Sequence, residues 1–346
     1  MADEWLDVRR HLVGNRYQLA VDAAEDYPAE RRVAGTPLLA PASWIPAEPV
    51  PLMSVGLEFD AGAVLTGVTG HEPFARELLP AEFGSYAEAI KGLAPPAVFE
   101  DRPTYRLTFA DLAGPDPVLR FGRGTYFDSI NTGEAAAHEY AAQRGSLRKA
   151  IGDPWDVTRR PTNIAISTLT IRADQEPRFF LHWRDPAKVG HAGGLYQVVP
   201  VGIFQPSADA AGNEQNDFSL WRNVVRELAE ELLGESEDYG EAPIQYDDWP
   251  FAARLAAGLK TGEVRAYCVG LGVDPLTFAT DLLTVLSIDA PIFDELFGGL
   301  VEANDEGRVL EPQPFTAEVV DNFVHHQPMQ AAGAALLQLA WTHQLA

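Results

Sequence analysis

The spacing of apolar and polar positions divides the first half of the chain into helical and strand-like stretches. Apolar residues at helical spacing predict a helix over 4–25, and the proline-rich stretch 36–59 predicts an extended segment instead of a helix. Further on, alternation with a period of two is typical of half-buried strands. The other elements expected here are a mixed helical stretch over 72–93, strands over 104–112 and 118–130, and a short helix over 133–145.

The second half predicts a sheet with one central helix packed on it. A strong strand pattern over 163–173 opens this half, and a polar loop over 205–216 leads into the helix. The other expected elements are strands over 177–185, 195–204 and 264–273, and helices over 278–286 and 329–345. This mixture predicts an α+β fold. Proline and glycine around Gly152 predict a boundary between an N-terminal α/β region of unrecognised type, 1–152, and a second domain, 153–346.

The central helix, written RNVVRELAEELLG, separates its apolar residues from its acidic ones. At 3.6 residues per turn, one stripe forms the expected core face: Trp221, Val224, Val225, Leu228 and Leu232. Glu227, Glu230 and Glu231 share a different face, where they repel one another by roughly a few tenths of a kcal/mol per exposed pair. A divalent cation with oxygen ligands would offset this repulsion, and Arg226 could orient a carboxylate or contact phosphate. The alternative is an acidic face exposed to water.

The motif Arg-Glu-Leu-x-Glu-Glu, 226–231, resembles the core of the Nudix box, the signature of the Nudix hydrolase family. The upstream sequence FFLHWRD…GGLYQVVPVGIF is similar to the strand, loop and strand that lead to the family's Pro-Gly-Gly turn, with Pro200 and Gly202 at the turn. The resemblance extends over 163–287. It implies a Nudix-like α/β/α sandwich with a mixed sheet, followed by a C-terminal helical extension.

The N-terminal half of the box departs from the family pattern. Phe218 stands where the first glutamate of the box is expected. Either Asp217 or Glu214 takes the role of this glutamate, or the chain has no equivalent of it. The loop before the helix carries an insertion over 205–216. Leu233 occupies the position of the box glycine, with Gly234 one residue late.

The resemblance also implies a function and its residues. It implies hydrolysis of a nucleoside diphosphate-linked or related diphosphate small molecule with Mg²⁺, or Mn²⁺ in its place. Glu227 and Arg226 would be catalytic, Arg184 and Gly202 would bind substrate, and the metal ligands would be Glu227, Glu230, Glu231 and Glu306. Because the family includes members without activity, the alternative is a ligand-binding regulatory protein that senses a nucleotide-like effector. Outside the motif, Glu134 and His138 are a weaker candidate metal pair, one helical turn apart.

The composition limits which classes of partner and which cellular compartment we expect for this protein. A formal net charge of −24 repels phosphate backbones and anionic lipid, so neither nucleic acid nor a membrane is expected as a partner. Cys268 is the only cysteine, which excludes an intramolecular disulfide and fits a reducing cytoplasm. The N-terminus lacks the pattern of a secretion signal, and no run of about 18 apolar residues occurs. A cytoplasmic protein is therefore expected, and the sequence leaves open whether it forms a homodimer.

Overall fold

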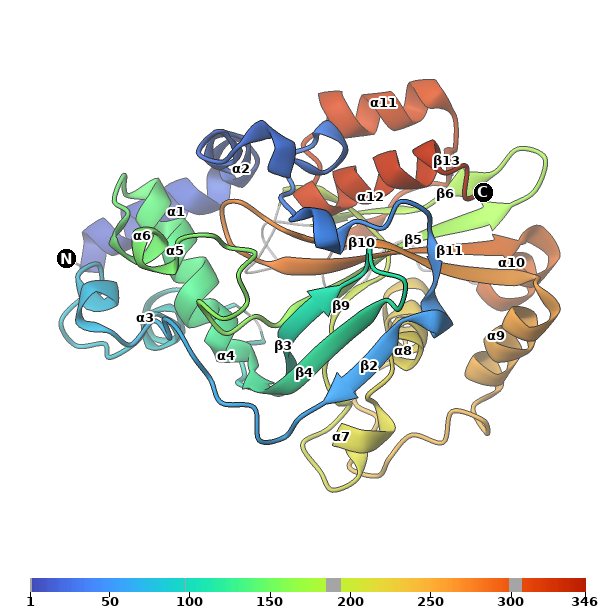
Figure 1. The fold of residues 1–346 in the computed structure, drawn as a ribbon, viewed down its shortest axis with the longest axis horizontal. Helices are drawn as coiled ribbons and strands as arrows, with labels where there is room; N and C mark the ends of the chain where they lie inside the picture. The colour runs from blue at the N-terminus through green and yellow to red at the C-terminus, as the bar shows by residue number, and fades with distance from the viewer. Residues whose placement is uncertain (1, 97, 185–193, 299–306) are drawn as a thin grey trace.

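The computed structural model describes residues 2–96, 98–184, 194–298 and 307–346, and the fold is α+β (Figure 1). The central sheet has the strand order β1-β10-β11-β5-β6-β13, and β9 also pairs with β5. Only β11 and β5 run parallel among these pairs, so the sheet is mixed. Its strands are β1 (Val50–Pro51), β5 (Ile164–Ala173), β6 (Arg178–Phe179), β9 (Val201–Ile203), β10 (Val264–Val273), β11 (Thr280–Asp289) and β13 (Gln313–Pro314).

Two smaller sheets lie beside the central one. The first comprises β12 (Gly307–Val309), β7 (Leu181–Arg184) and β8 (Tyr196–Val198), and the second comprises β2 (Gly56–Phe59), β4 (Val118–Thr125) and β3 (Pro103–Asp111). The α-helices are α1 (Ala2–Gly14), α2 (Arg16–Glu25), α3 (Tyr86–Leu93), α4 (Tyr126–Ser129), α5 (Ala135–Ala141), α6 (Ser146–Ile151), α7 (Asn213–Asn216), α8 (Leu220–Leu233), α9 (Pro250–Thr261), α10 (Ala290–Phe297), α11 (Ala317–His326) and α12 (Ala331–Thr342). A π-helical turn, η6 (Ile130–Glu134), joins α4 to α5.

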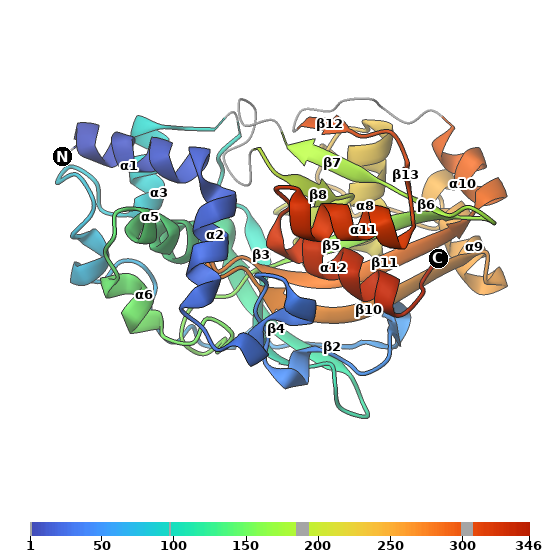
Figure 2. The same ribbon diagram turned by 90° about the horizontal axis from the view of Figure 1, so that it is seen from above.

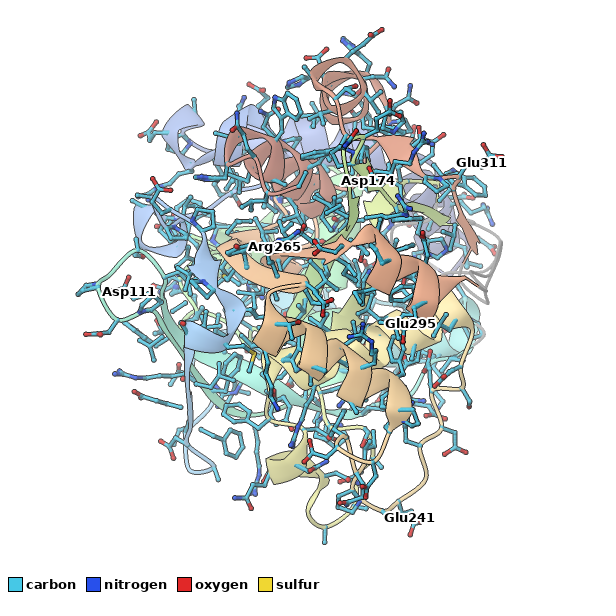
Figure 3. The ribbon with its side chains drawn as sticks, turned by 90° about the vertical axis from the view of Figure 1, so that its right-hand side faces the viewer. Asp111, Asp174, Glu241, Arg265, Glu295 and Glu311 are labelled. Carbon is cyan, nitrogen blue, oxygen red and sulfur yellow. The ribbon has the colours of Figure 1, made fainter. Side chains whose placement is uncertain are left out.

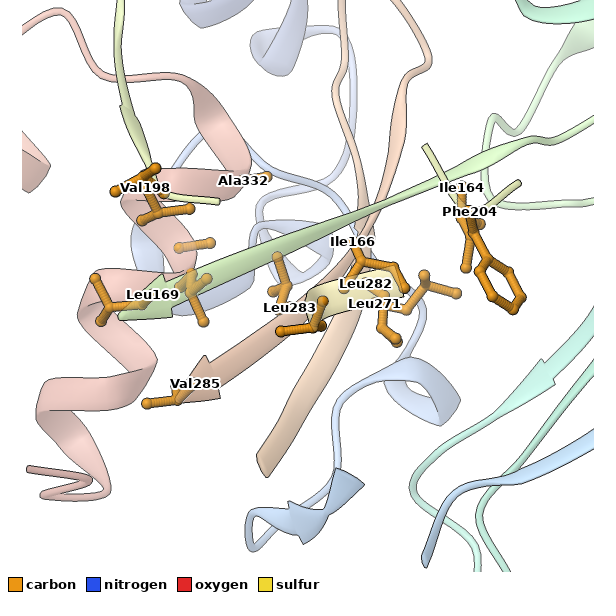
Figure 4. Packing of buried hydrophobic residues seen from close by; sticks show 14 of the residues in the cluster. Ile164, Ile166, Leu169, Val198, Phe204, Leu271, Leu282, Leu283, Val285 and Ala332 are labelled. Atoms are coloured by element: carbon orange, nitrogen blue, oxygen red, sulfur yellow. The ribbon is translucent and has the colours of Figure 1, made fainter. Parts of the chain in front are cut away.

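Helices cover both faces of the central sheet. In Figure 1 the sheet is seen close to edge-on, with α12 above the strands and α8 below them. Because both faces are covered, the strands in the middle have few exposed positions: Leu169, Leu283 and Val285 are fully buried (Figure 4). The expected C-terminal extension therefore includes a helix, α12, that forms one layer of the core.

The predicted strands over 163–173 and 264–273 are confirmed as β5 and β10. The helix expected over 278–286 is wrong, because this stretch belongs to β11. The polar residues of this stretch, Thr280, Asp281 and Thr284, are buried and recur at helical spacing instead of alternating, so the pattern imitates one face of a helix. The single strand expected over 195–204 is two strands, β8 and β9, which pair with different neighbours on either side of Pro200.

The N-terminal segment packs against the second half of the chain. β1 extends the edge of the central sheet by pairing with β10. The Leu107 N–H donates to the Thr162 carbonyl at 2.7 Å, and the Tyr105 N–H donates to the Phe204 carbonyl at 3.1 Å. Residues before Gly152 thus supply both an edge strand and a neighbouring sheet, while a domain boundary at this glycine remains a prediction.

Charged side chains project from the surface of the second half (Figure 3). Glu241 and Glu311, both labelled in the figure, are exposed, and nearby arginines pair with other acids, as Arg254 does with Glu295 at 3.1 Å. Within the described ranges, no helix has both the length and the apolar character needed to cross a membrane.

Candidate functional site

Helix α8 carries the acidic motif and has a defined start and end. The Ser219 hydroxyl accepts a hydrogen bond from the Arg222 N–H at 3.3 Å, which caps the helix N-terminus. At the other end Gly234 adopts φ 70°, the left-handed conformation that commonly ends helices. The glycine that stands one place late in the motif therefore ends the helix.

Two glutamates of α8, Glu227 and Glu231, lie against strand β9, and the third, Glu230, lies beside Tyr239. One Glu231 carboxylate oxygen accepts a hydrogen bond from the Val201 N–H at 2.8 Å, and Glu231 is buried. Glu227 and Glu230 are half-buried. The Glu227 carboxylate approaches Gly202 so closely that a Cβ at this position would lie 1.8 Å from its Cδ. A freely solvated acidic face is therefore wrong for this helix, and Gly202, expected to bind substrate, makes room for Glu227.

His182 is a site residue that the sequence analysis missed. Its Nδ1 lies 3.7 Å from the second carboxylate oxygen of Glu231, and the residue is only 1% exposed. It stands on β7, which was expected as a strand, but its partner lies on α8, far along the chain. No local pattern could indicate this pair, because strand pairing and helix packing bring the two residues together.

Glu230 is a partly buried carboxylate close to another acidic residue. Its pKa is raised to about 7, mainly by burial and also by the nearby Glu237, although the Tyr239 hydroxyl, Arg226 and Arg102 lower it in part. A carboxylate in such surroundings is charged in only part of the molecules at neutral pH. A cation placed beside it would lower this pKa and stabilise the charged form.

Arg226, expected to be catalytic, is held inside the protein by four polar contacts. Its guanidinium donates to the Tyr246 hydroxyl at 2.9 Å, to the Gln205 carbonyl at 2.7 Å and to the Asn223 side chain at 3.1 Å. It also lies 3.5 Å from the carboxylate of Asp217, and both residues are buried. These contacts indicate that Arg226 anchors the inserted loop and the segment after α8 to the helix.

Phe218 connects α8 to the N-terminal sheet. Its ring contacts a group of aromatic residues from β2, β3, β4 and the end of β9: Phe59, Tyr105, Phe121 and Phe204. The position of the missing glutamate is thus part of an apolar contact between the two halves of the chain. Because Phe218 is half-buried, a carboxylate there would lose part of its solvation among aromatic rings, which is unfavourable.

Neither candidate substitute for that glutamate is available for a ligand. Asp217 is buried and accepts hydrogen bonds from the Ser207 N–H at 2.8 Å, the Ser207 hydroxyl at 2.6 Å and the Tyr246 hydroxyl at 3.0 Å. Glu214 forms a two-point ion pair with Arg123, at 2.7 and 2.8 Å. Both carboxylates therefore stabilise the inserted loop.

The described residues include no group of three or more His, Cys, Asp or Glu side chains arranged to hold a metal ion. Glu306 and the side chain of Arg184 lie outside what the structure describes, and the backbone of Arg184 pairs with Gly307 at the end of β7. The Glu134 carboxylate of the weaker candidate pair instead accepts hydrogen bonds from Arg9 at 2.5 Å and Arg16 at 2.7 Å.

Replacement of Gly202 by alanine tests the contact between β9 and Glu227. The new methyl group would overlap the Glu227 carboxylate, which lies at the end of a flexible side chain and can rotate away. We expect a small loss of stability, about 1 kcal/mol, and a loss of any function that needs Glu227 in place. Urea unfolding and a binding assay measure the two effects, and unchanged binding would show that the position of Glu227 is irrelevant.

Comparison with known proteins does not assign the chain to a family. No protein-family model matches it, and no curated protein sequence does. The shielded carboxylates of α8, together with the strands packed against them, are therefore what a functional proposal has to rest on.

Proposed function

We propose that the chain is a Nudix-like hydrolase that uses Mg²⁺ to cleave a diphosphate-linked small molecule, such as a nucleoside diphosphate joined to another group. The observation that carries this proposal is that three glutamates of one helix are wholly or partly shielded from solvent, Glu227 and Glu231 against β9 and Glu230 beside Tyr239. Like charges that are shielded from solvent destabilise the folded protein unless a counter-charge offsets them. Their order in the sequence matches the intact half of the motif.

The donor chemistry of the site fits Mg²⁺ bound together with a ligand. Mg²⁺ is usually held by one or two carboxylates and completes its coordination with water and substrate phosphates. Glu227 and Glu230, one helical turn apart and half-buried, would hold it. Such a site needs no cage of three protein ligands. When bound, Mg²⁺ supplies neutralisation of the diphosphate charge and polarisation of a phosphorus–oxygen bond.

In this proposal Glu227 has two tasks, holding the cation and accepting a proton, whereas Glu231 and His182 position the helix. Glu231 fixes the distance between α8 and β9 through the Val201 N–H, and His182 supports its second oxygen. Glu227 accepts the proton from the water that attacks one phosphorus atom. The bond between that phosphorus and the bridging oxygen breaks, and the other phosphate leaves with the bridging oxygen.

A panel of diphosphates tests the proposal. ADP-ribose, sugar nucleotides and dinucleoside polyphosphates are incubated with the protein and Mg²⁺, and products are followed by ³¹P NMR. We expect turnover of at least one compound, lost on addition of EDTA and restored by excess Mg²⁺. If no compound is cleaved and none changes the melting temperature with Mg²⁺ present, the glutamates do not form a diphosphate site.

A second candidate function is a regulatory protein that binds the same class of ligand without cleaving it. The packing of Phe218 favours it, because this ring replaces a charged residue of the motif and ties α8 to the N-terminal sheet. Ligand binding at α8 would then be transmitted to β2, β3 and β4. The same panel distinguishes the two functions: a rise in melting temperature without any product in ³¹P NMR supports the regulatory protein.

A further inference from the structure

A pocket of about 410 Å³ lies where α3 faces α4 and the π-helical turn η6. Pockets of this volume commonly bind small molecules. Figure 2 shows α3 among the N-terminal helices, at the opposite end of the molecule from α9 and α10. The polar side chains that line the pocket include Ser85, Lys91, Asp101, Asp128 and Asn131.

Asn131 brings an enclosed donor to this pocket. The residue belongs to η6 and is only 6% exposed. Its Oδ1 accepts a hydrogen bond from the Ala87 N–H at 2.9 Å, and within the described part of the chain its Nδ2 has no acceptor. The side-chain atoms there that lack a partner and are closed to water belong to other residues, so the Asn131 Nδ2 keeps surface on the pocket. Such a donor favours a ligand that brings an acceptor.

Helix α3 adds two more donors beside Asn131. Ser85 caps the helix, because its hydroxyl oxygen accepts from the Glu88 N–H at 3.2 Å, and its O–H is left to donate. Lys91, almost two turns further along α3, carries an ammonium group on a flexible side chain. The Glu88 carboxylate accepts from the Gly84 N–H at 2.7 Å, at the start of the helix. This side of the pocket therefore suits a carboxylate of a ligand.

Two aspartates form the other side of the pocket. Asp101 Oδ1 accepts from the Phe127 N–H at 2.8 Å, and Asp128 Oδ2 accepts from the Thr125 N–H at 2.9 Å. Among the described residues, none donates to the second oxygen of either carboxylate. Two acceptors are therefore left for a ligand that brings donors.

The two aspartates also favour a positive charge between them. Burial raises the pKa of Asp128, and the neighbouring Asp101 adds to this, whereas a backbone hydrogen bond, Arg106 and His71 lower it in part. The Arg106 guanidinium donates to two backbone carbonyls, at 2.9 and 2.7 Å. Because the described residues include no set of three side chains arranged for a metal ion, an organic ammonium group is the cation that suits this place. The ring of Phe127, which also lines the pocket, is a further favourable contact for it.

We propose that this pocket binds a free α-amino acid. Its ammonium group lies between Asp101 and Asp128, and its carboxylate accepts hydrogen bonds from Asn131, Ser85 and Lys91. A zwitterion meets both sides of the pocket, whereas a simple amine or a simple carboxylate leaves one side without a partner. The volume of the pocket leaves room for the side chain of the amino acid. This site is separate from the carboxylates of α8 and does not depend on the function proposed for them.

Thermal unfolding with single amino acids tests the proposal. Each of the protein amino acids is added separately at about 5 mM, and we expect at least one of them to raise the melting temperature by about 2–5 °C. The N-acetyl derivative of that amino acid lacks the ammonium charge, and its amide lacks the carboxylate, so neither derivative should change the melting temperature. If no amino acid has an effect, or if either derivative has the full effect, the proposal is overturned.

Two substitutions at exposed residues locate the binding. Lys91→Gln removes the positive charge on α3, and Asp101→Asn removes a negative charge while its new amide oxygen can still accept from the Phe127 N–H. We expect each to weaken binding of the amino acid at least about 10-fold in a calorimetric titration. Lys149→Gln and Asp116→Asn, also exposed but outside the pocket, are the matched controls and should bind as the parent protein does. Parent-like affinity in Lys91→Gln and Asp101→Asn would mean that the amino acid binds elsewhere.

Discussion

Glu230→Gln should reduce Mg²⁺-dependent diphosphate cleavage at least about 100-fold and at the same time stabilise the protein at pH 8. Glutamine has nearly the same shape but cannot hold a divalent cation as a carboxylate does. The stability gain follows from burial, which raises the pKa of Glu230 to about 7 from its ordinary value near 4.5. A group that folding forces to carry its charge in a poorly solvated place opposes folding at high pH.

The direction of the expected change in stability follows from how the protonation of Glu230 varies with pH. Between pH 4.5 and 7 the folded protein keeps a proton on Glu230 that the unfolded chain has lost, so the contribution of this group to stability falls as pH rises through that window. Above pH 7 the penalty is complete and stays constant. Urea unfolding without metal should therefore show Glu230→Gln more stable than the parent protein by about 1–3 kcal/mol at pH 8, and nearly equal to it at pH 4.

Glu235 provides the matched control, because it is an exposed glutamate just beyond the end of the same helix. Glu235→Gln should change neither turnover nor the pH dependence of unfolding. Full activity in Glu230→Gln would remove Glu230 from the metal site. An unfolding curve with the same pH dependence as the parent protein would show that Glu230 is solvated in the metal-free protein.

The sequence predicted those elements whose pattern is set by one exposed face or by strict alternation. α8 was expected because its apolar residues repeat at helical spacing. β10 was expected because its sequence, VRAYCVGLGV, is a short apolar stretch with several valines. β11 was mistaken for a helix, since its buried polar residues, Thr280, Asp281 and Thr284, do not alternate with apolar ones. Pairing of β9 with β5, and of β12 with β7, depends on contacts between segments that are separated by other elements along the chain, so no local pattern indicates it.

For the candidate site, the sequence predicted which residues share a helix face but not what surrounds them. Helical geometry alone placed Glu227, Glu230 and Glu231 on one face. The packing of Glu227 and Glu231 against β9, and the approach of His182, depend on strands that the motif does not encode. Arg226 is the clearest example of what the sequence does not reveal. The motif around it is the same whether its side chain contacts a ligand or a buried aspartate.

Arg226→Met should destabilise the protein by about 3–5 kcal/mol, the cost of leaving one partner of a buried ion pair without the other. Methionine fills part of the space but leaves Asp217 fully buried without its guanidinium neighbour. The Tyr246 hydroxyl and the Gln205 carbonyl lose a hydrogen-bond partner as well. The free energy of unfolding in urea measures the effect. Arg222→Met, on the same helix but half-buried, should cost only about 1 kcal/mol.

A double variant separates a structural arginine from a catalytic one. Asp217→Asn removes the buried negative charge, so adding it to Arg226→Met should recover part of the lost stability, and the two effects should not add. If Arg226 instead contacts phosphate during catalysis, Arg226→Met would leave the free energy of unfolding almost unchanged and abolish turnover. Because the guanidinium of Arg226 has four polar partners within the protein, we expect the loss of stability to dominate. Any fall in turnover should then follow the fraction of folded protein.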